Sequence, residues 1–430
     1  MKTGWSLLSA AVRIRKTPFL LAVTFTLATA TATATPTATP ETFVQVTAGD
    51  LVITDDNGGT SADSLTVSLS GANVRITDPN NTLAAGPGAT QTDANTVEVP
   101  LSSIGGNITV NTLGGNDVLT LDLTGGDFIP ASGLFFNGGN PTTGPGDKLV
   151  VTGGSQGTVT YNYSNAHDGS IVMSNFGTVT YTGLEPITNS GTASDIVFNL
   201  PSGPNAATLA DDGTASNGMS RLSGATIETT DFAGPTGSLT INRGNAADTL
   251  AVNALPDFDA SLTIGSGANP FSTITFNGAV TLAANKNLSG DASNSISLPN
   301  TTSDLATSGT GTISLTTARD INIAGGHISV VNGNMTLSAN AAATNTATTT
   351  GIDISTAASL TSSGTGAISL TGKGGSSAVS GGLRGIYIHG ASTVSSTSSS
   401  GSAGAITINA TGGTFTGADG GLNNAGLVIQ

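Results

Sequence analysis

The sequence predicts an all-β protein. We expect a parallel β-helix, or solenoid, in its C-terminal half and a β-solenoid or β-sandwich-like region in its N-terminal half. Charged residues make up only 9% of the 430 residues and aromatic residues 4%, whereas 59 are glycine. An α/β enzyme would need helices rich in Ala, Leu, Glu and Lys, which this composition does not supply. The absence of cysteine excludes a disulfide scaffold and a Cys-based zinc site.

The N-terminus has the pattern of an export signal. A basic cluster at 13–16 precedes the apolar segment 19–27, and an Ala-x-Ala cleavage motif follows at 28–30. We therefore predict a signal peptide over 1–34 and a Thr/Pro/Ala linker over 35–40; an uncleaved anchor is the alternative. No other apolar run is long enough to span a bilayer, so we expect no membrane span after signal removal.

Short segments with apolar residues at every second position indicate strands throughout the rest of the chain. The clearest are Leu65–Leu69, Ile108–Val110, Val118–Leu121, Thr158–Tyr161, Leu239–Ile241 and Ile313–Leu315. Acidic residues are concentrated early, with 22 of the 27 lying within 41–260. We therefore divide the chain into an acidic β-rich region over 41–234 and β-helical repeats over 235–430.

Internal repeats predict the solenoid. Gly309–Thr316 is repeated at Gly364–Thr371 and again, in shorter form, at Gly404–Asn409. A second theme recurs at Gly351–Ile354, Gly385–Ile388 and Gly426–Ile429. Strands this short bury an apolar face only by stacking on copies of themselves. The last copy ends at Gln430, so we expect a C-terminally truncated stack whose open end allows end-to-end self-association.

The segment Gly309–Gly333 resembles the repeats of large exported bacterial surface proteins of the filamentous-haemagglutinin type. The segments Thr112–Asp122 and Thr158–Pro186 also resemble parts of very large repetitive exported proteins. The resemblance implies a right-handed β-helical stalk with a role in adhesion or surface structure. It implies no catalytic residues.

These observations predict a secreted or cell-surface bacterial protein that is structural or adhesive and is not an enzyme. Its expected partners are cell-surface or extracellular-matrix components, including carbohydrate. The net charge of −15 argues against nucleic acid, which is bound mainly through Lys and Arg.

A secreted carbohydrate-active β-helix enzyme is the main alternative. Asp211 and Asp212 form an adjacent acidic pair of the kind that glycoside hydrolysis uses, but they lack basic partners in the sequence. The three histidines, at positions 167, 327 and 389, have no metal-ligand spacing between them. We therefore predict each to be a surface or ladder residue.

Calcium is the one cofactor that the sequence suggests. Asp117 stands in a Gly-x-Asp-x-apolar motif typical of calcium β-rolls, and Asp122 and Asp127 are nearby oxygen donors. Capping of turns through the local backbone is the competing interpretation. A calcium-dependent carbohydrate-binding module within 41–234 is therefore a third hypothesis. Three tyrosines, at positions 161, 163 and 181, could form an exposed strip for sugar stacking or pack in the core.

Overall fold

The computed structural model describes residues 41–56, 61–140, 144–344, 346–347, 349–378, 381–399, 401–417 and 424–430. This part of the chain is built from strands and turns with one short 3-10 helix, η1 (Leu101–Ser103), so the all-β prediction is confirmed. Pro40–Gln430 form one compact unit. The predicted signal peptide and linker lie outside the described residues. Within those residues, no helix has the length and apolar character that crossing a membrane requires.

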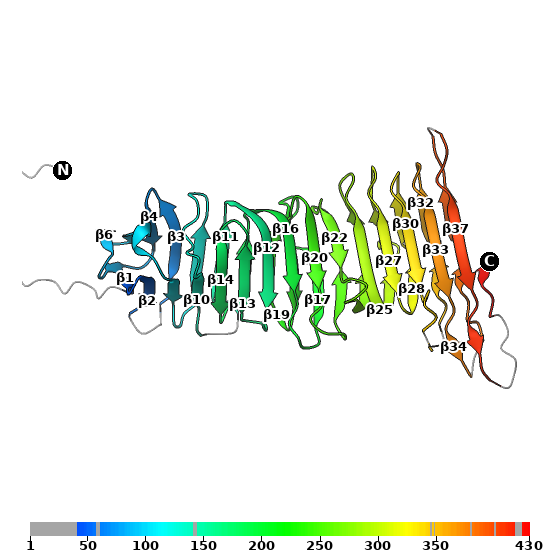
Figure 1. The fold of residues 1–430 in the computed structure, drawn as a ribbon, viewed down its shortest axis with the longest axis horizontal. Helices are drawn as coiled ribbons and strands as arrows, with labels where there is room; N and C mark the ends of the chain where they lie inside the picture. The colour runs from blue at the N-terminus through cyan, green and yellow to red at the C-terminus, as the bar shows by residue number, and fades with distance from the viewer. Residues whose placement is uncertain are drawn as a thin grey trace, which may run out of the picture. The chain divides into compact units, whose positions relative to one another are not determined.

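Two ladders of hydrogen-bonded strands run through this unit (Figure 1). The first ladder contains, in order of pairing, β2 (Asp50–Asp55), β8 (Ile108–Asn111), β10 (Leu134–Asn137), β14 (Gly177–Thr182), β13 (Gly169–Met173), β12 (Ser155–Tyr163), β16 (Thr192–Asn199), β20 (Ser238–Asn242), β22 (Ser261–Ile264), β25 (Leu288–Leu298), β27 (Ile313–Thr317), β30 (Met335–Ala339), β33 (Ile368–Lys373) and β37 (Ile406–Thr411). A hairpin partner, β1 (Thr42–Thr47), pairs with β2 and with β5 (Leu83–Ala85).

The second ladder contains, in order of pairing, β6 (Thr90–Asp93), β7 (Thr96–Pro100), β4 (Asn73–Thr77), β3 (Ser64–Ser70), β9 (Val118–Asp122), β11 (Lys148–Thr152), β15 (Ile187–Asn189), β19 (Ile227–Ala233), β18 (Met219–Gly224), β17 (Ala206–Asp211), β21 (Thr249–Val252), β23 (Phe271–Phe276), the second half of β25, β28 (Asp320–Ala324), β31 (Ile352–Ser355), β35 (Ile386–Ile388) and β39 (Leu427–Ile429). The strand segments predicted from the sequence all fall within these two ladders.

The pairing pattern of the strands differs along the chain. Over 41–234, which we call the first region, each ladder contains an antiparallel meander: β12–β13–β14 in the first ladder and β17–β18–β19 in the second. The second ladder also begins with the antiparallel run β6–β7–β4–β3. Over 235–430, the second region, the described pairings between strands are parallel.

A third ladder exists only in the second region. It consists of β24 (Val280–Thr281), β26 (Leu305–Ala306), β29 (His327–Val330), β32 (Ser359–Ser362) and β36 (Thr393–Ser396). A short parallel pair, β34 (Ser376–Ser377) and β38 (Thr414–Phe415), lies outside these ladders. From β22 to β33 the chain passes through the first, second and third ladders in rotation, with β25 contributing to the first two.

In-register stacking builds the core. Ile313 pairs with Met335, and Met335 pairs with Ile368; all three are fully buried. Alternate residues of a strand face opposite sides, so every second position joins such a column. Each buried side chain of this size contributes about 1.5–3 kcal/mol relative to exposure.

The observed stacking corrects the repeat spacing inferred from sequence. The similar segments at Ile313 and Ile368 are not neighbours, because Met335–Ala339 lies between them in the ladder. The copy at Ile406 does pair directly with Ile368. The second theme pairs directly at every step, Ile352 with Ile386 and Ile386 with Leu427.

The recurring glycines have a steric cause. A Cβ atom on Gly333 would collide with the carbonyl oxygen of Gly311, and one on Gly366 would collide with that of Gly333. The same relation holds between Gly404 and Gly366. Only glycine allows the backbones of successive turns to approach this closely.

Candidate functional site

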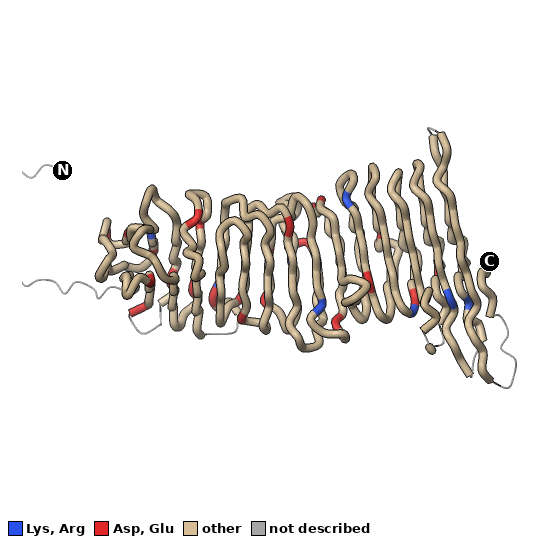
Figure 2. The backbone as a smooth tube through the Cα atoms, in the orientation of Figure 1, with Lys and Arg blue, Asp and Glu red and all other residues tan. Residues whose placement is uncertain are grey.

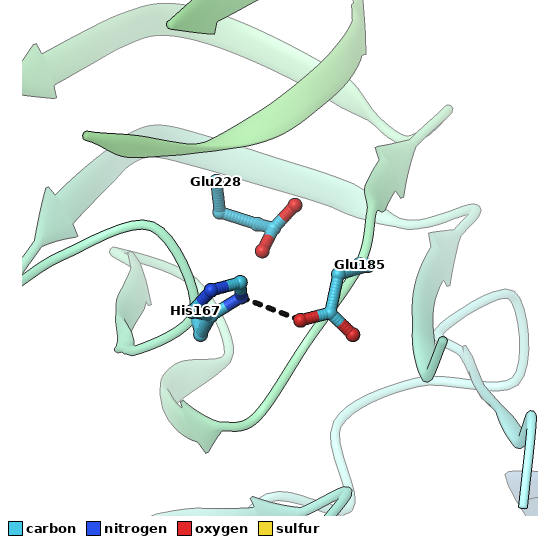
Figure 3. Close-up of side chains that lie close together, drawn as sticks. All are labelled: His167, Glu185 and Glu228. Atoms are coloured by element: carbon cyan, nitrogen blue, oxygen red, sulfur yellow. Dashed lines mark ion pairs between the residues drawn. The ribbon is translucent and has the colours of Figure 1, made fainter. Parts of the chain in front are cut away.

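Three side chains converge in the first region, in the part of the chain that contains both meanders. His167, Glu185 and Glu228 point toward one another (Figure 3), and one ligand atom from each lies within 4.8 Å of the other two. His167 lies in the turn between β12 and β13, Glu185 follows β14, and Glu228 is the second residue of β19. No other group of three His, Asp or Glu side chains among the described residues meets this spacing.

The turn that carries His167 is held by side-chain hydrogen bonds. Asn165 Oδ1 accepts hydrogen bonds from the backbone N–H groups of His167 (2.8 Å) and Asp168 (3.0 Å). Asp168 Oδ1 accepts one from the N–H of Gly183, and Leu184 N–H donates to the carbonyl of His167. The imidazole is therefore fixed against the segment that leads to Glu185.

Glu185 is held from the opposite side. Its backbone N–H donates to the carbonyl of Asp147, one strand earlier in the second ladder. His167 Nδ1 lies 2.5 Å from Glu185 Oε1 and 3.2 Å from the carbonyl oxygen of Leu184. Glu185 Oε1 and Oε2 are both buried and accept no well-directed hydrogen bond.

Glu228 is buried by an irregularity in β19. Leu222 pairs with Thr230, whereas Gly224 pairs with Ile227, so β19 has one residue more than its partner at this point. Such bulges redirect side chains and are frequent beside functional sites. Glu228 lies within the bulge and is 3% exposed, with Oε2 unpartnered. Burial, and then the charge of Glu185, raise the pKa of Glu228 to about 8.

The cluster opens into a pocket of about 740 Å³. Arg221, Lys148 and Asn116 also line this pocket, and His167 borders a second pocket of about 520 Å³. The guanidinium of Arg221 is engaged by Asp231 through two contacts of 2.6 and 2.9 Å. Polar groups and both carboxylates thus face a space large enough for a small ligand.

The three predicted calcium ligands occupy separate places. Asp122 Oδ1 accepts hydrogen bonds from the N–H and hydroxyl of Thr124, and Asp127 Oδ1 accepts one from the N–H of Ile129. Each of these two carboxylates therefore caps a turn of its own local backbone. The structure does not gather them with Asp117 into a cluster of ligand atoms, and calcium binding at these residues stays a prediction.

Asp117 belongs instead to a column of buried aspartates. Asp117 Oδ1 accepts the N–H of Asp63 (2.8 Å), and Asp147 Oδ1 accepts the N–H of Asp117 (2.9 Å). Capping therefore runs between neighbouring strands of the second ladder, not within one turn as the sequence suggested. Burial raises the pKa of Asp63 to about 7 and that of Asp147 to about 6, and also raises the pKa of Asp117.

The remaining candidates have structural partners. Asp212 caps a turn through the N–H of Thr214 and also accepts a hydrogen bond from Asn217. His327 contacts the hydroxyl of Ser359, and His389 contacts Asp353. The prediction of ladder or surface roles is confirmed for these two histidines.

The sequence does not indicate that His167 lies beside Glu185 and Glu228. The spacing among the three histidines does not reveal it, because the neighbours of His167 are glutamates 18 and 61 positions further along the chain. Only an antiparallel meander in each ladder brings these positions together. One feature of the sequence does point to Glu228. It lies four residues before Phe232 in the same strand, so the period-two pattern places its carboxylate on the buried face.

The tyrosines pack in the core. Tyr161 and Tyr181 are fully buried and Tyr163 is 5% exposed, so the exposed-strip alternative is wrong. Tyr161 stacks on Phe198 with ring centroids 4.7 Å apart, and Phe232 meets Phe198 edge-on at 5.1 Å. Burial keeps the pKa of Tyr181 above its ordinary value, and the charge of Glu228 adds to this effect.

Comparisons with known proteins identify no relative. No protein-family model, curated protein or solved structure matches the chain.

Proposed function

We propose that this protein is an exported, non-enzymatic β-solenoid that forms a stalk at the bacterial cell surface and acts in adhesion or surface structure. The observation that carries the proposal is the parallel, in-register pairing from β27 to β37 in the second region. Inward columns of Ile and Leu give it a continuous core, and each added turn extends the same surface.

The outward-facing groups support the same role. Asn199 Nδ2 donates to Asn162 Oδ1, and Asn242 Nδ2 donates to Asn199 Oδ1, at 2.7 and 2.9 Å. Many outward positions of the second region are Thr, Ser or Asn. Acidic residues are sparse towards the C-terminal end of this region (Figure 2). A surface of repeated hydroxyl and amide groups suits many weak contacts with carbohydrate or matrix, for which multivalency supplies the strength.

Removal of one turn tests the solenoid. Deleting residues 313–334 joins Thr312 to Met335 and removes one strand from each ladder without changing the register. We expect this variant to fold, with circular dichroism unchanged in shape. Deleting Thr336 alone, within β30, brings Met335 and Leu337 into adjacent positions and should impair folding, because one of these two apolar side chains would then face outward. Equal folding of both variants would contradict a solenoid.

Surface display tests the function. Bacteria that display the full chain are compared with bacteria that display a variant lacking residues 41–234, and with bacteria that display no protein. Attachment under flow is measured on surfaces coated with polysaccharides or matrix proteins. We expect attachment that depends on the displayed chain. Hydrolysis of a soluble polysaccharide by the purified protein, abolished by Glu185→Gln, would instead support the carbohydrate-active alternative.

A further inference from the structure

We propose that His167, Glu185 and Glu228 bind one divalent metal ion of the zinc type. The proposal concerns the first region and does not depend on the adhesive role. It adds a site that the predicted calcium ligands, Asp117, Asp122 and Asp127, do not include.

Geometry is the first observation. The three ligand atoms lie within 4.8 Å of one another, and the side chains face a common centre (Figure 3). Zinc binds imidazole nitrogen and carboxylate oxygen at about 2.0–2.2 Å. Small side-chain rotations therefore place all three atoms around one ion, and the surrounding backbone, held by Asn165 and Asp168, need not move.

Unpartnered buried oxygens are the second, independent observation. Glu228 is 97% buried, since its exposed fraction is 3%, and its Oε2 has no hydrogen-bond partner. Its carboxylate points at the other two side chains (Figure 3). A buried carboxylate oxygen without a donor is unfavourable, and a bound cation removes that cost.

The donor set selects the kind of metal. Calcium takes six to eight oxygen ligands, more than two glutamates provide. One imidazole and two carboxylates suit zinc, with manganese as a weaker fit. The pocket of about 740 Å³ borders the cluster, so a fourth position is open to water or to an oxygen atom of a ligand.

The competing account needs no metal. His167 Nδ1 lies 2.5 Å from Glu185 Oε1, which is an ion pair when the imidazole is protonated. In that account Glu228 carries a proton. In the first account the three side chains together bind a metal ion, and in the second they bind none. Titration of the protein with zinc distinguishes the two accounts.

The test uses isothermal titration calorimetry of metal-stripped full-length protein with ZnCl₂, MnCl₂ and CaCl₂. We expect about one equivalent of Zn²⁺ to bind, more tightly than Mn²⁺ or Ca²⁺. His167→Ala and Glu228→Gln should each weaken zinc binding by at least about 10-fold. The matched control His327→Ala, on the exposed His327, should stay within about twofold. Absence of zinc binding, or equal affinity in all variants, would overturn the proposal.

A second measurement uses the unsubstituted protein, so it tests the proposal even where a variant does not fold. Crystals soaked in ZnCl₂ are measured at the zinc absorption edge. An anomalous peak between His167, Glu185 and Glu228 would support the site. A peak only elsewhere, or none, would overturn it.

Discussion

The first and second regions share two ladders but use them differently. In the second region the described strands pair in parallel, and the core consists mostly of Ile and Leu columns, with Phe258, Phe271 and Phe276 near its start. In the first region the meanders reverse the chain, and the core contains aromatic rings and buried carboxylates. The candidate site lies in the first region. The comparison shows that the cluster of His167, Glu185 and Glu228 lies where the regular stacking of parallel strands is interrupted.

The reason is geometric. In a parallel in-register ladder, an inward residue lies beside the residue at the same position of the neighbouring strand. A meander sends the strand back and places different sequences opposite each other. The bulge at Glu228 arises in such a place. The four predictions below test this contrast, from the largest expected effect to the smallest.

The core of the second region should not tolerate a carboxylate. Leu337 is fully buried between Leu315 and Leu370. Leu337→Asp buries a charge with no partner and should destabilise the fold by more than about 4 kcal/mol. Ser338→Asp, one position along on the outward side, is the control and should cost less than about 1 kcal/mol. Urea denaturation measures both, and equal effects would contradict the inward assignment.

The core of the first region should depend on aromatic packing. Phe198 contacts the rings of Tyr161, Tyr163 and Phe232 at centroid distances of 4.7, 6.0 and 5.1 Å. Phe198→Ala should lower the free energy of unfolding by about 3–5 kcal/mol. Phe198→Leu, which keeps most of the volume, should lower it by less than half as much. Thermal and urea unfolding measure the pair; an equal loss in both would show that volume does not matter here.

Stability of the first region should fall as pH rises from about 4 to 8. Burial raises the pKa of Asp63 from 3.8 to about 7, with Asn81 opposing and Asp117, Asp55 and Asp78 adding. The folded state therefore holds a proton that the unfolded state has released over this range, so folding is favoured at the acidic end. The effect is on the order of 2–4 kcal/mol and is lost as pH passes 7.

Asp63→Asn should flatten part of this dependence, because asparagine does not titrate and can still accept the hydrogen bond from Asn81. Urea unfolding at pH 5 and pH 8 gives the comparison, and Asp93→Asn, on an exposed strand, is the control. An opposite sign, with greater stability at pH 8, would contradict the buried protonated state of Asp63.

The outward ladders should contribute least. Asn199 makes two amide hydrogen bonds, whereas Ser297 in the second region makes one hydroxyl contact with Thr275 at 3.3 Å. Asn199→Ala should cost about 1–2 kcal/mol and Ser297→Ala less than about 0.5 kcal/mol. Hydrogen exchange of the flanking strands measures local stability. A larger effect at Ser297 would reverse the ranking of the two regions.

Particular residues show how far sequence reasoning reached. Alternation at Leu65–Leu69 and Ile313–Leu315 predicted strands that are present, because period two follows from strand geometry alone. The repeat at Ile368 was found, but its true neighbour, Met335, was not. Met335-Thr336-Leu337 has the same alternation of inward apolar and outward hydroxyl residues as Ile313-Ser314-Leu315, but two of its three residue types differ.

By itself, the sequence determined the all-β class and the strand segments, since each depends on local alternation, glycine spacing and composition. Tertiary structure alone decided which strands reverse, and therefore which distant residues meet. His167, Glu185 and Glu228 converge only because a meander occurs in each ladder. Antiparallel and parallel strands share the same period-two pattern, so the direction of pairing is not written in local sequence.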